Sequence, residues 1–110
     1  MDPEREERFA RNEALFREVN ERIESLAEPD TATDELALFT CECANLACSK
    51  RIQASLDEYE LVRSRPTWFL VAPRHLDLEV EEVIAEREEF WIVEKRRAAG
   101  EAARALDPRT

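Results

Sequence analysis

The chain has 110 residues, of which 44% are hydrophobic and 38% are charged, and its formal net charge is −10. This length suits one domain with a modest core. No apolar run approaches the ~18 residues of a membrane span and no N-terminal signal peptide is recognisable, so we expect a cytoplasmic protein without a membrane segment. The acidic charge repels phosphate backbones and anionic lipids, which disfavours binding to nucleic acids and to membranes.

Residues 1–28 are expected to consist of one long amphipathic helix that begins near Asp2. Asp2 can cap it, Pro3 suits the first helical position, and the glutamates that follow favour the positive end of the helix dipole. Oppositely charged pairs four residues apart, including Glu13–Arg17, are expected on its outer face. Apolar residues recur at helical spacing and form a stripe of Phe9, Phe16, Val19, Ile23 and Leu26, with Leu15 beside it and Asn12 in the missing position.

Two kinds of surface could cover this apolar stripe. The helix can lie on its own domain, as amphipathic helices of globular proteins do. Alternatively, it can form a coiled coil with a second copy or with a protein partner, with Asn12 setting the register. The stripe spans only about three heptads, which is near the minimum for a coiled coil.

Residues 29–35 contain Pro29 and several turn formers, and they are expected to link the helix to a compact α+β domain over residues 36–97. A C-terminal helix and tail are expected over residues 98–110. The predicted fold class is therefore α+β: a long N-terminal helix followed by a small antiparallel-sheet domain that carries a zinc-type site.

The elements expected in the remainder of the chain are mostly strands. Alternating or β-branched residues predict strands over 36–41, 50–56 and 67–71. Ser55 and Glu58 match a capping box, which predicts a short helix over 57–64. Residues 80–86 and 90–93 are expected to pair as a hairpin, and the alanine-rich residues 96–106 are expected to form a short helix interrupted at Gly100.

All three cysteines lie within eight residues, at Cys41, Cys43 and Cys48, and the single histidine is His75. Sulfur and imidazole ligands favour zinc, which takes four ligands at tetrahedral angles. Two sulfurs on one zinc lie roughly 3.8 Å apart, so the chain must bend between Cys41 and Cys43. Asn45 can take the left-handed conformation that the loop to Cys48 requires. We expect His75 to be the fourth ligand, with Glu42, Asp77 or water as the alternatives.

Such a site is expected to be structural. Three thiolates weaken the acidity of the metal towards water, and a fourth protein ligand closes the coordination shell. Metal binding in small zinc modules contributes about 10–16 kcal/mol, whereas a domain of this size is stable by about 5–15 kcal/mol. Loss of the metal could therefore unfold the compact domain. We find no nucleophile–base pair and no phosphate-binding glycine loop, so we do not expect an enzyme.

Several stretches resemble a set of small, uncharacterised bacterial proteins that are commonest in high-GC Gram-positive genomes and share a CxCx4C pattern with a later histidine. The resemblance rests on residues 12–20, 39–43, Cys48, 55–63, 69–73, His75 and 91–95. In those proteins a glycine usually precedes the histidine, where this chain has Arg74. The resemblance implies that the three cysteines and His75 act as one unit, and it implies no activity.

Three functions can be compared on this basis. The first is a zinc-stabilised module for protein–protein interaction or regulation, dimeric or partner-binding through the N-terminal helix. The second is a redox-responsive thiol switch, in which oxidation of Cys43 and Cys48 expels the metal. The third, nucleic-acid binding through Arg63, Arg65 and Arg74, is disfavoured because the neighbouring aromatic residues belong to a buried strand.

Overall fold

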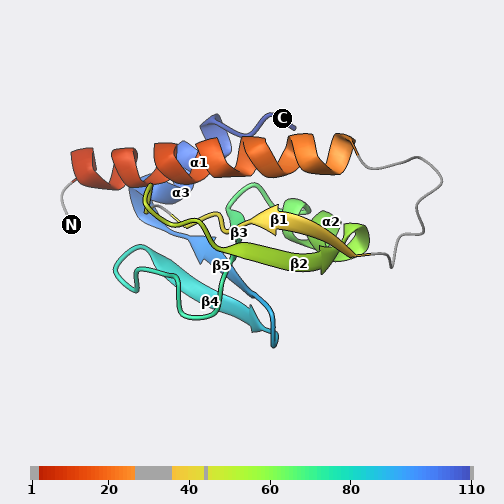
Figure 1. Cartoon of the computed structure of the whole chain (residues 1–110). Helices are drawn as coiled ribbons and strands as arrows, with labels where there is room; N and C mark the ends of the chain where they lie inside the picture. Colours follow the sequence, from red (N-terminus) through yellow and green to blue (C-terminus); the bar gives the residue numbers. More distant parts are fainter. Residues whose placement is uncertain (1–2, 27–35, 44, 110) are drawn as a thin grey trace.

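The protein is represented by a computed structural model that describes residues 3–26, 36–43 and 45–109 (Figure 1). The linker predicted over residues 29–35 lies outside these ranges. The helices and strands follow in the order α1 (Pro3–Ser25), β1 (Leu36–Thr40), β2 (Arg51–Ser55), α2 (Leu56–Arg63), β3 (Trp68–Val71), β4 (Glu81–Glu86), β5 (Trp91–Lys95) and α3 (Arg97–Ala105). The predicted α+β fold with a long N-terminal helix is confirmed.

The strands form two small antiparallel sheets. One is the β1–β2 hairpin, and the other has the order β3–β5–β4, with β5 in the centre. The predicted hairpin of residues 80–93 is therefore present as β4 and β5, with an irregular register between Val83 and Ala85. The sheets share one apolar core, in which the rings of Phe39 and Tyr59 stack with their centroids 4.5 Å apart.

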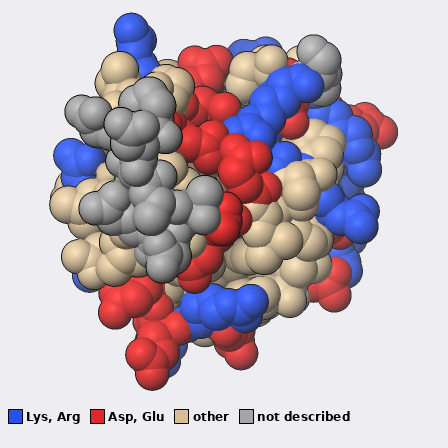
Figure 2. Space-filling model, turned by 90° about the vertical axis from the view of Figure 1, so that its right-hand side faces the viewer, with Lys and Arg blue, Asp and Glu red and all other residues tan. Residues whose placement is uncertain are grey.

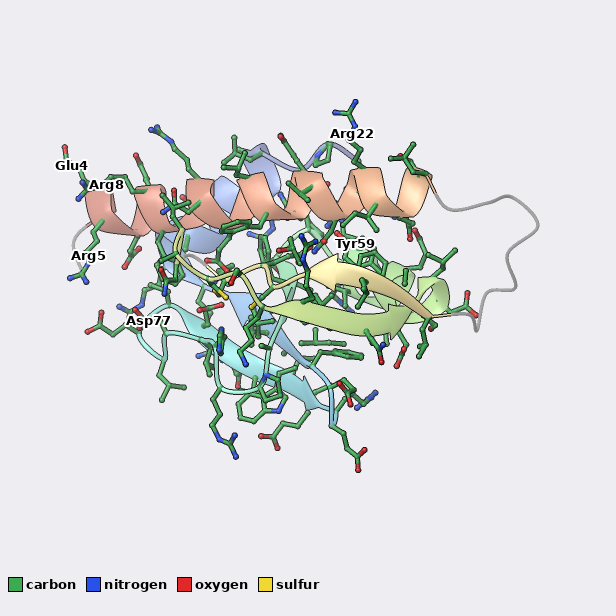
Figure 3. The ribbon with its side chains drawn as sticks, viewed as in Figure 1. Glu4, Arg5, Arg8, Arg22, Tyr59 and Asp77 are labelled. Atoms are coloured by element: carbon green, nitrogen blue, oxygen red, sulfur yellow. The ribbon has the colours of Figure 1, made fainter. Side chains whose placement is uncertain are left out.

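Helix α2 begins with the capping box that the sequence predicts. The Ser55 hydroxyl accepts a hydrogen bond from the Glu58 amide at 3.0 Å, and the Ser55 amide donates to the Glu58 carboxylate at 2.8 Å. Two amides at the start of the helix thus find partners locally. This helix positions Tyr59 in the interior beneath α1, as Figure 3 shows.

Helix α1 lies along its own domain, beside α3 and β1 (Figure 1), but the face it buries is not the predicted apolar stripe. Val19 and Leu26 are 43% and 76% exposed, and the flanking Leu15 is 53% exposed. The remaining stripe residues Phe9, Phe16 and Ile23 are only half-buried. The fully packed side is formed by small and polar residues, namely Glu6, Ala10, Glu13, Ala14, Arg17 and Asn20.

The expectation that Glu13 and Arg17 form a solvated surface pair is wrong. Glu13 forms a buried ion pair with Lys95 of β5, which also pairs with Glu81. Arg17 donates to the carbonyl oxygens of Pro66 at 2.7 Å and Ala103 at 2.9 Å. Burial raises the pKa of Glu13 well above its usual value, although the Lys95 ammonium opposes that rise. Glu13 and Arg17 thus each have a partner inside the protein that comes from a distant part of the chain.

Helix α3 runs without a break from Arg97 to Ala105, so the interruption predicted at Gly100 is wrong. A Cβ atom at this position would lie 2.9 Å from the carbonyl oxygen of Lys95. Glycine is therefore needed for close packing of the helix against the end of β5, rather than to end the helix. Among the described residues, no helix has both the length and the apolar character that a membrane span requires.

The C-terminal residues fasten the end of α1 to α2 through ion pairs. Arg109 donates to three carboxylates, and the buried Arg63 joins α1 to the C-terminal segment. Figure 2 views the molecule from this end and shows acidic side chains in a band beside basic ones. The carboxylates in these contacts belong to Glu21, Glu24 and Glu60 for Arg109, and to Glu21 and Asp107 for Arg63.

Candidate metal centre

The cysteine segment, residues 41–43, begins where β1 ends and is held between the two sheets. The Cys41 amide donates to the carbonyl oxygen of Lys50 at 3.1 Å, which extends the β1–β2 pairing by one residue. The next amide, of Glu42, donates instead to the carbonyl oxygen of Leu70 in β3 at 2.7 Å. The segment therefore passes from one sheet to the other between these two residues, and Cys41 lies at the junction.

His75 reaches the cysteines from the turn that follows β3. Its amide donates to the carbonyl oxygen of Ala72 at 3.0 Å, and Arg74 has a φ of 71°. A positive φ is costly for a residue with a Cβ atom, so this turn is strained at Arg74.

The structure brings all four predicted ligands together. The ligand atoms of Cys41, Cys43, Cys48 and His75 all lie within 4.8 Å of one another. The Nδ1 atom of His75 lies 3.7 Å from Sγ of Cys41 and 3.6 Å from Sγ of Cys48. Ligand atoms around one tetrahedral zinc are separated by roughly 3.5–4 Å, so this donor set fits a single metal ion.

The surroundings of the thiols affect their protonation. Hydrogen bonding with Cys41, supported by His75 and Cys48, lowers the pKa of Cys43 to about 4. The same hydrogen bond and burial raise the pKa of Cys41, while the Ala72 amide, which donates to Sγ of Cys41 at 3.1 Å, opposes that rise. The Cys43 thiolate is the form that binds a metal cation, whereas Cys41 has to lose its proton when a metal binds.

Asn45 stabilises a turn in the chain that leads to Cys48. Its side-chain oxygen accepts from the Ala47 amide at 2.9 Å and its carbonyl accepts from the Cys48 amide at 2.9 Å. These two bonds direct the chain back towards the other sulfurs.

Glu42, an alternative ligand in the sequence analysis, is fully buried and engaged elsewhere. Its carboxylate accepts hydrogen bonds from the Asn20 amide at 2.9 Å, the Tyr59 hydroxyl at 2.8 Å and the Leu70 amide at 2.8 Å. Burial raises its pKa, and these donors oppose the shift. Alternation along an extended chain places Glu42 on the opposite side from its cysteine neighbours, which is the one sequence signal for this role.

A second link joins this segment to α1. The Asn20 side chain donates to the carbonyl oxygen of Thr40, the residue before Cys41, and accepts from the Thr40 amide. Asn20 therefore contacts the residues on both sides of Cys41. Sequence reasoning missed Asn20, because an asparagine in a helix with many charged residues does not stand out.

A hollow of about 400 Å³ adjoins the cluster on the side of Cys43 and His75. Its walls come from α1, the cysteine loop, the turn after β3 and the start of β4, and they include Phe9, Arg74 and Asp77. Figure 3 places Asp77 below the N-terminal half of α1. The other alternative ligand, Asp77, thus lines this hollow and is not part of the cluster.

The arginines once considered for nucleic-acid binding lie in three different settings. Arg63 is buried in its ion pairs, and the guanidinium of Arg65 lies 5.4 Å from the ring centroid of Trp68. Arg74 is exposed at the rim of the hollow.

No protein-family model matches this sequence, and neither a curated protein nor a solved structure matches it.

Proposed function

We propose that Cys41, Cys43, Cys48 and His75 bind one structural Zn²⁺ ion in a protein that serves as an interaction or regulatory module. The observation that carries this proposal is the convergence of four donor atoms, three sulfurs and one imidazole nitrogen, within 4.8 Å. Three thiolates and an imidazole form a donor set typical of structural zinc. When bound, the ion would join the β1–β2 hairpin to the turn after β3.

A structural role is favoured over catalysis for two reasons. Four protein ligands fill a tetrahedral shell and leave no position for a reacting water. The buried carboxylate of the cysteine segment belongs to Glu42, and it accepts hydrogen bonds from Asn20, Tyr59 and Leu70. Its oxygens are therefore already engaged and are poorly placed to act as a general base. We therefore propose that the protein is not an enzyme.

The proposed interaction surface is the outer face of α1. Leu15, Val19 and Leu26 are exposed at spacings that place them on one side of the helix. Arg22, which falls on the same side, points away from the domain in Figure 3. This exposed apolar surface suits a protein partner or a second copy of the chain. Because the net charge is −10, we propose neither nucleic acid nor membrane as the partner. The proposed location is the cytoplasm.

Elemental analysis of protein purified under reducing conditions tests the metal site. We expect about one zinc per chain in the wild type and a marked loss in Cys48→Ser and His75→Ala. Ser49→Ala is the matched control, because Ser49 is exposed and adjacent to a ligand. A wild-type protein that folds without any bound metal would overturn the proposal.

The surface on α1 is tested separately by sedimentation of the zinc-loaded protein. If the second copy is the partner, the wild type should sediment as a dimer and Val19→Glu as a monomer with unchanged zinc content. A wild type that stays monomeric at high concentration excludes self-association through α1.

A further inference from the structure

The three cysteines differ in how firmly their surroundings hold them. Cys41 is 1% exposed, its sulfur accepts the Ala72 amide, and its own amide is bonded to Lys50. Cys43 lines the hollow of about 400 Å³ beside the cluster. Cys48 is half-buried and follows three exposed residues, 45–47. A small oxidant therefore has space to reach Cys43, and Cys48 lies next to the exposed part of the loop.

We propose that a hydroperoxide oxidises Cys43 and Cys48 to a disulfide, and that this reversible modification regulates the metal site. The inference rests on the proposed zinc site and assigns its regulation to a particular pair of sulfurs. It leaves Cys41 and His75 as the remaining ligands, and two ligands hold zinc far more weakly than four.

The chemistry proceeds in two steps. The Cys43 thiolate attacks one oxygen of hydrogen peroxide and the O–O bond breaks, which leaves a sulfenic acid on Cys43. The departing hydroxide takes a proton from the buffer and becomes water. The Cys48 thiolate then attacks this sulfur, the S–O bond breaks, and a second hydroxide leaves as water after protonation. Two sulfurs lose one electron each, one molecule of peroxide is reduced to two of water, and the zinc ion keeps its oxidation state.

The choice of pair follows from the chain between the sulfurs. Cys43 and Cys48 are joined by a turn in which residues 45–47 are exposed, so their Cβ atoms can adjust to disulfide geometry. A bond from Cys41 would instead require the strand end to give up its contacts with Ala72 and Lys50. A Cys43–Cys48 disulfide leaves the bonds of Cys41 with Ala72 and Lys50 in place.

The modification has a path to α1. The segment Thr40–Cys43 carries Glu42, and Asn20 is bonded to both Thr40 and Glu42. When Cys43 moves towards Cys48 and the ion leaves, the backbone of this segment loses one of its two anchors. We expect backbone hydrogen exchange at Thr40 and in α1 around Asn20 to accelerate on the order of tenfold.

The experiment adds one equivalent of hydrogen peroxide to zinc-loaded protein and follows zinc release with a chromophoric chelator. Free thiols are then alkylated, and the chain is cleaved after glutamate. Cleavage after Glu42 separates Cys41 from Cys43 and Cys48. The proposed disulfide leaves Cys41 alkylated on its own peptide, whereas any disulfide that involves Cys41 holds the two peptides together.

The expected result is zinc release in step with alkylation confined to Cys41, together with recovery of zinc binding after reduction by dithiothreitol. Retention of zinc, or linked peptides across Glu42, would overturn this inference and leave the proposed zinc site intact. Protein that contains no zinc before peroxide is added would instead contradict the proposed function, and this inference with it. Hydrogen exchange at Thr40 that does not change would exclude the path to α1.

Discussion

The side chain of Asn20 pairs with both backbone groups of Thr40, donating from Nδ2 to the carbonyl oxygen at 2.8 Å and accepting the amide hydrogen at Oδ1 at 2.7 Å. In this way an amide on α1 takes the place of a neighbouring strand at the edge of β1. The same Nδ2 atom reaches the buried carboxylate of Glu42 at 2.9 Å. One side chain thus joins the long helix to the cysteine segment.

Replacement of Asn20 by alanine should destabilise the protein strongly. The Thr40 backbone groups would lose a partner and Glu42 would lose one of its three donors, so we expect a loss of about 2–4 kcal/mol in the free energy of unfolding. Urea denaturation followed by circular dichroism measures this loss. Arg22→Ala on the exposed side of the same helix is the control and should change stability by less than about 0.5 kcal/mol. Equal effects of the two substitutions would contradict the assigned role of Asn20.

Glu24 should make the protein less stable as the pH rises. Burial, and then a hydrogen bond with Glu60, raise the pKa of Glu24 from 4.5 to about 7. The folded state therefore binds this proton more tightly than the unfolded state, so the stabilising contribution is complete below pH 4.5 and is lost as the pH rises through about 7. Glu24→Gln should lessen the decline in unfolding free energy across this interval.

Denaturant titrations of wild type and Glu24→Gln at several pH values test this dependence. The difference in stability between them should move in favour of the variant from acidic to mildly alkaline pH. Glu18→Gln, which changes an exposed glutamate on the same helix, should keep the wild-type dependence. Parallel curves for all three proteins would show that Glu24 is not the group responsible.

Alanine at position 100 should destabilise the protein even though alanine favours helices. The added Cβ would lie 2.9 Å from the carbonyl oxygen of Lys95, which belongs to the backbone and cannot rotate away. We expect a net loss of about 1–3 kcal/mol, against a gain of about 1 kcal/mol at an unconstrained helical site. The exposed Glu101→Ala is the control and should be nearly neutral. A thermal midpoint for Gly100→Ala at or above that of the wild type would refute the close contact.

Glycine at position 74 should stabilise the protein, because the φ of 71° at Arg74 suits glycine better than arginine. We expect a gain of about 1 kcal/mol, since relief of backbone strain exceeds the entropy that glycine adds to the unfolded chain. The same substitution at the exposed Arg87, which does not have a positive φ, should instead be neutral or mildly destabilising. Thermal denaturation of both variants distinguishes these outcomes, and similar losses in both would disprove strain at position 74.

Local sequence patterns predicted the features whose partners lie nearby in the chain. The Ser55–Glu58 capping box involves residues three positions apart, and β2 begins with the alternation of exposed and buried residues that burial of one face requires. The cysteines could be recognised as a site because they cluster, and His75 because it is the only histidine. The sequence alone therefore predicted which residues form the candidate metal site.

The buried polar side of α1 was not predictable in the same way. Glu13 and Arg17 fit a pattern of charged pairs four residues apart, and only the positions of Lys95, Pro66 and Ala103 reveal why they are buried. For Glu42, alternation indicates only that it points away from its cysteine neighbours, and its three donors are known only from the folded structure. Partners that lie far away in sequence leave no periodic signal, so such pairs require the folded structure.

The dependence of α1 on residues near the other end of the chain has a consequence for biosynthesis. Arg17 binds the carbonyl oxygen of Ala103, which is 86 residues further on, so α1 leaves the ribosome well before its partner on α3 has been translated. During that delay the side of the helix destined for the interior carries Glu13, Arg17 and Asn20, which water solvates well. A nascent chain with this composition can remain dispersed until its C-terminal partners emerge, whereas a leucine-rich surface in the same place would invite aggregation.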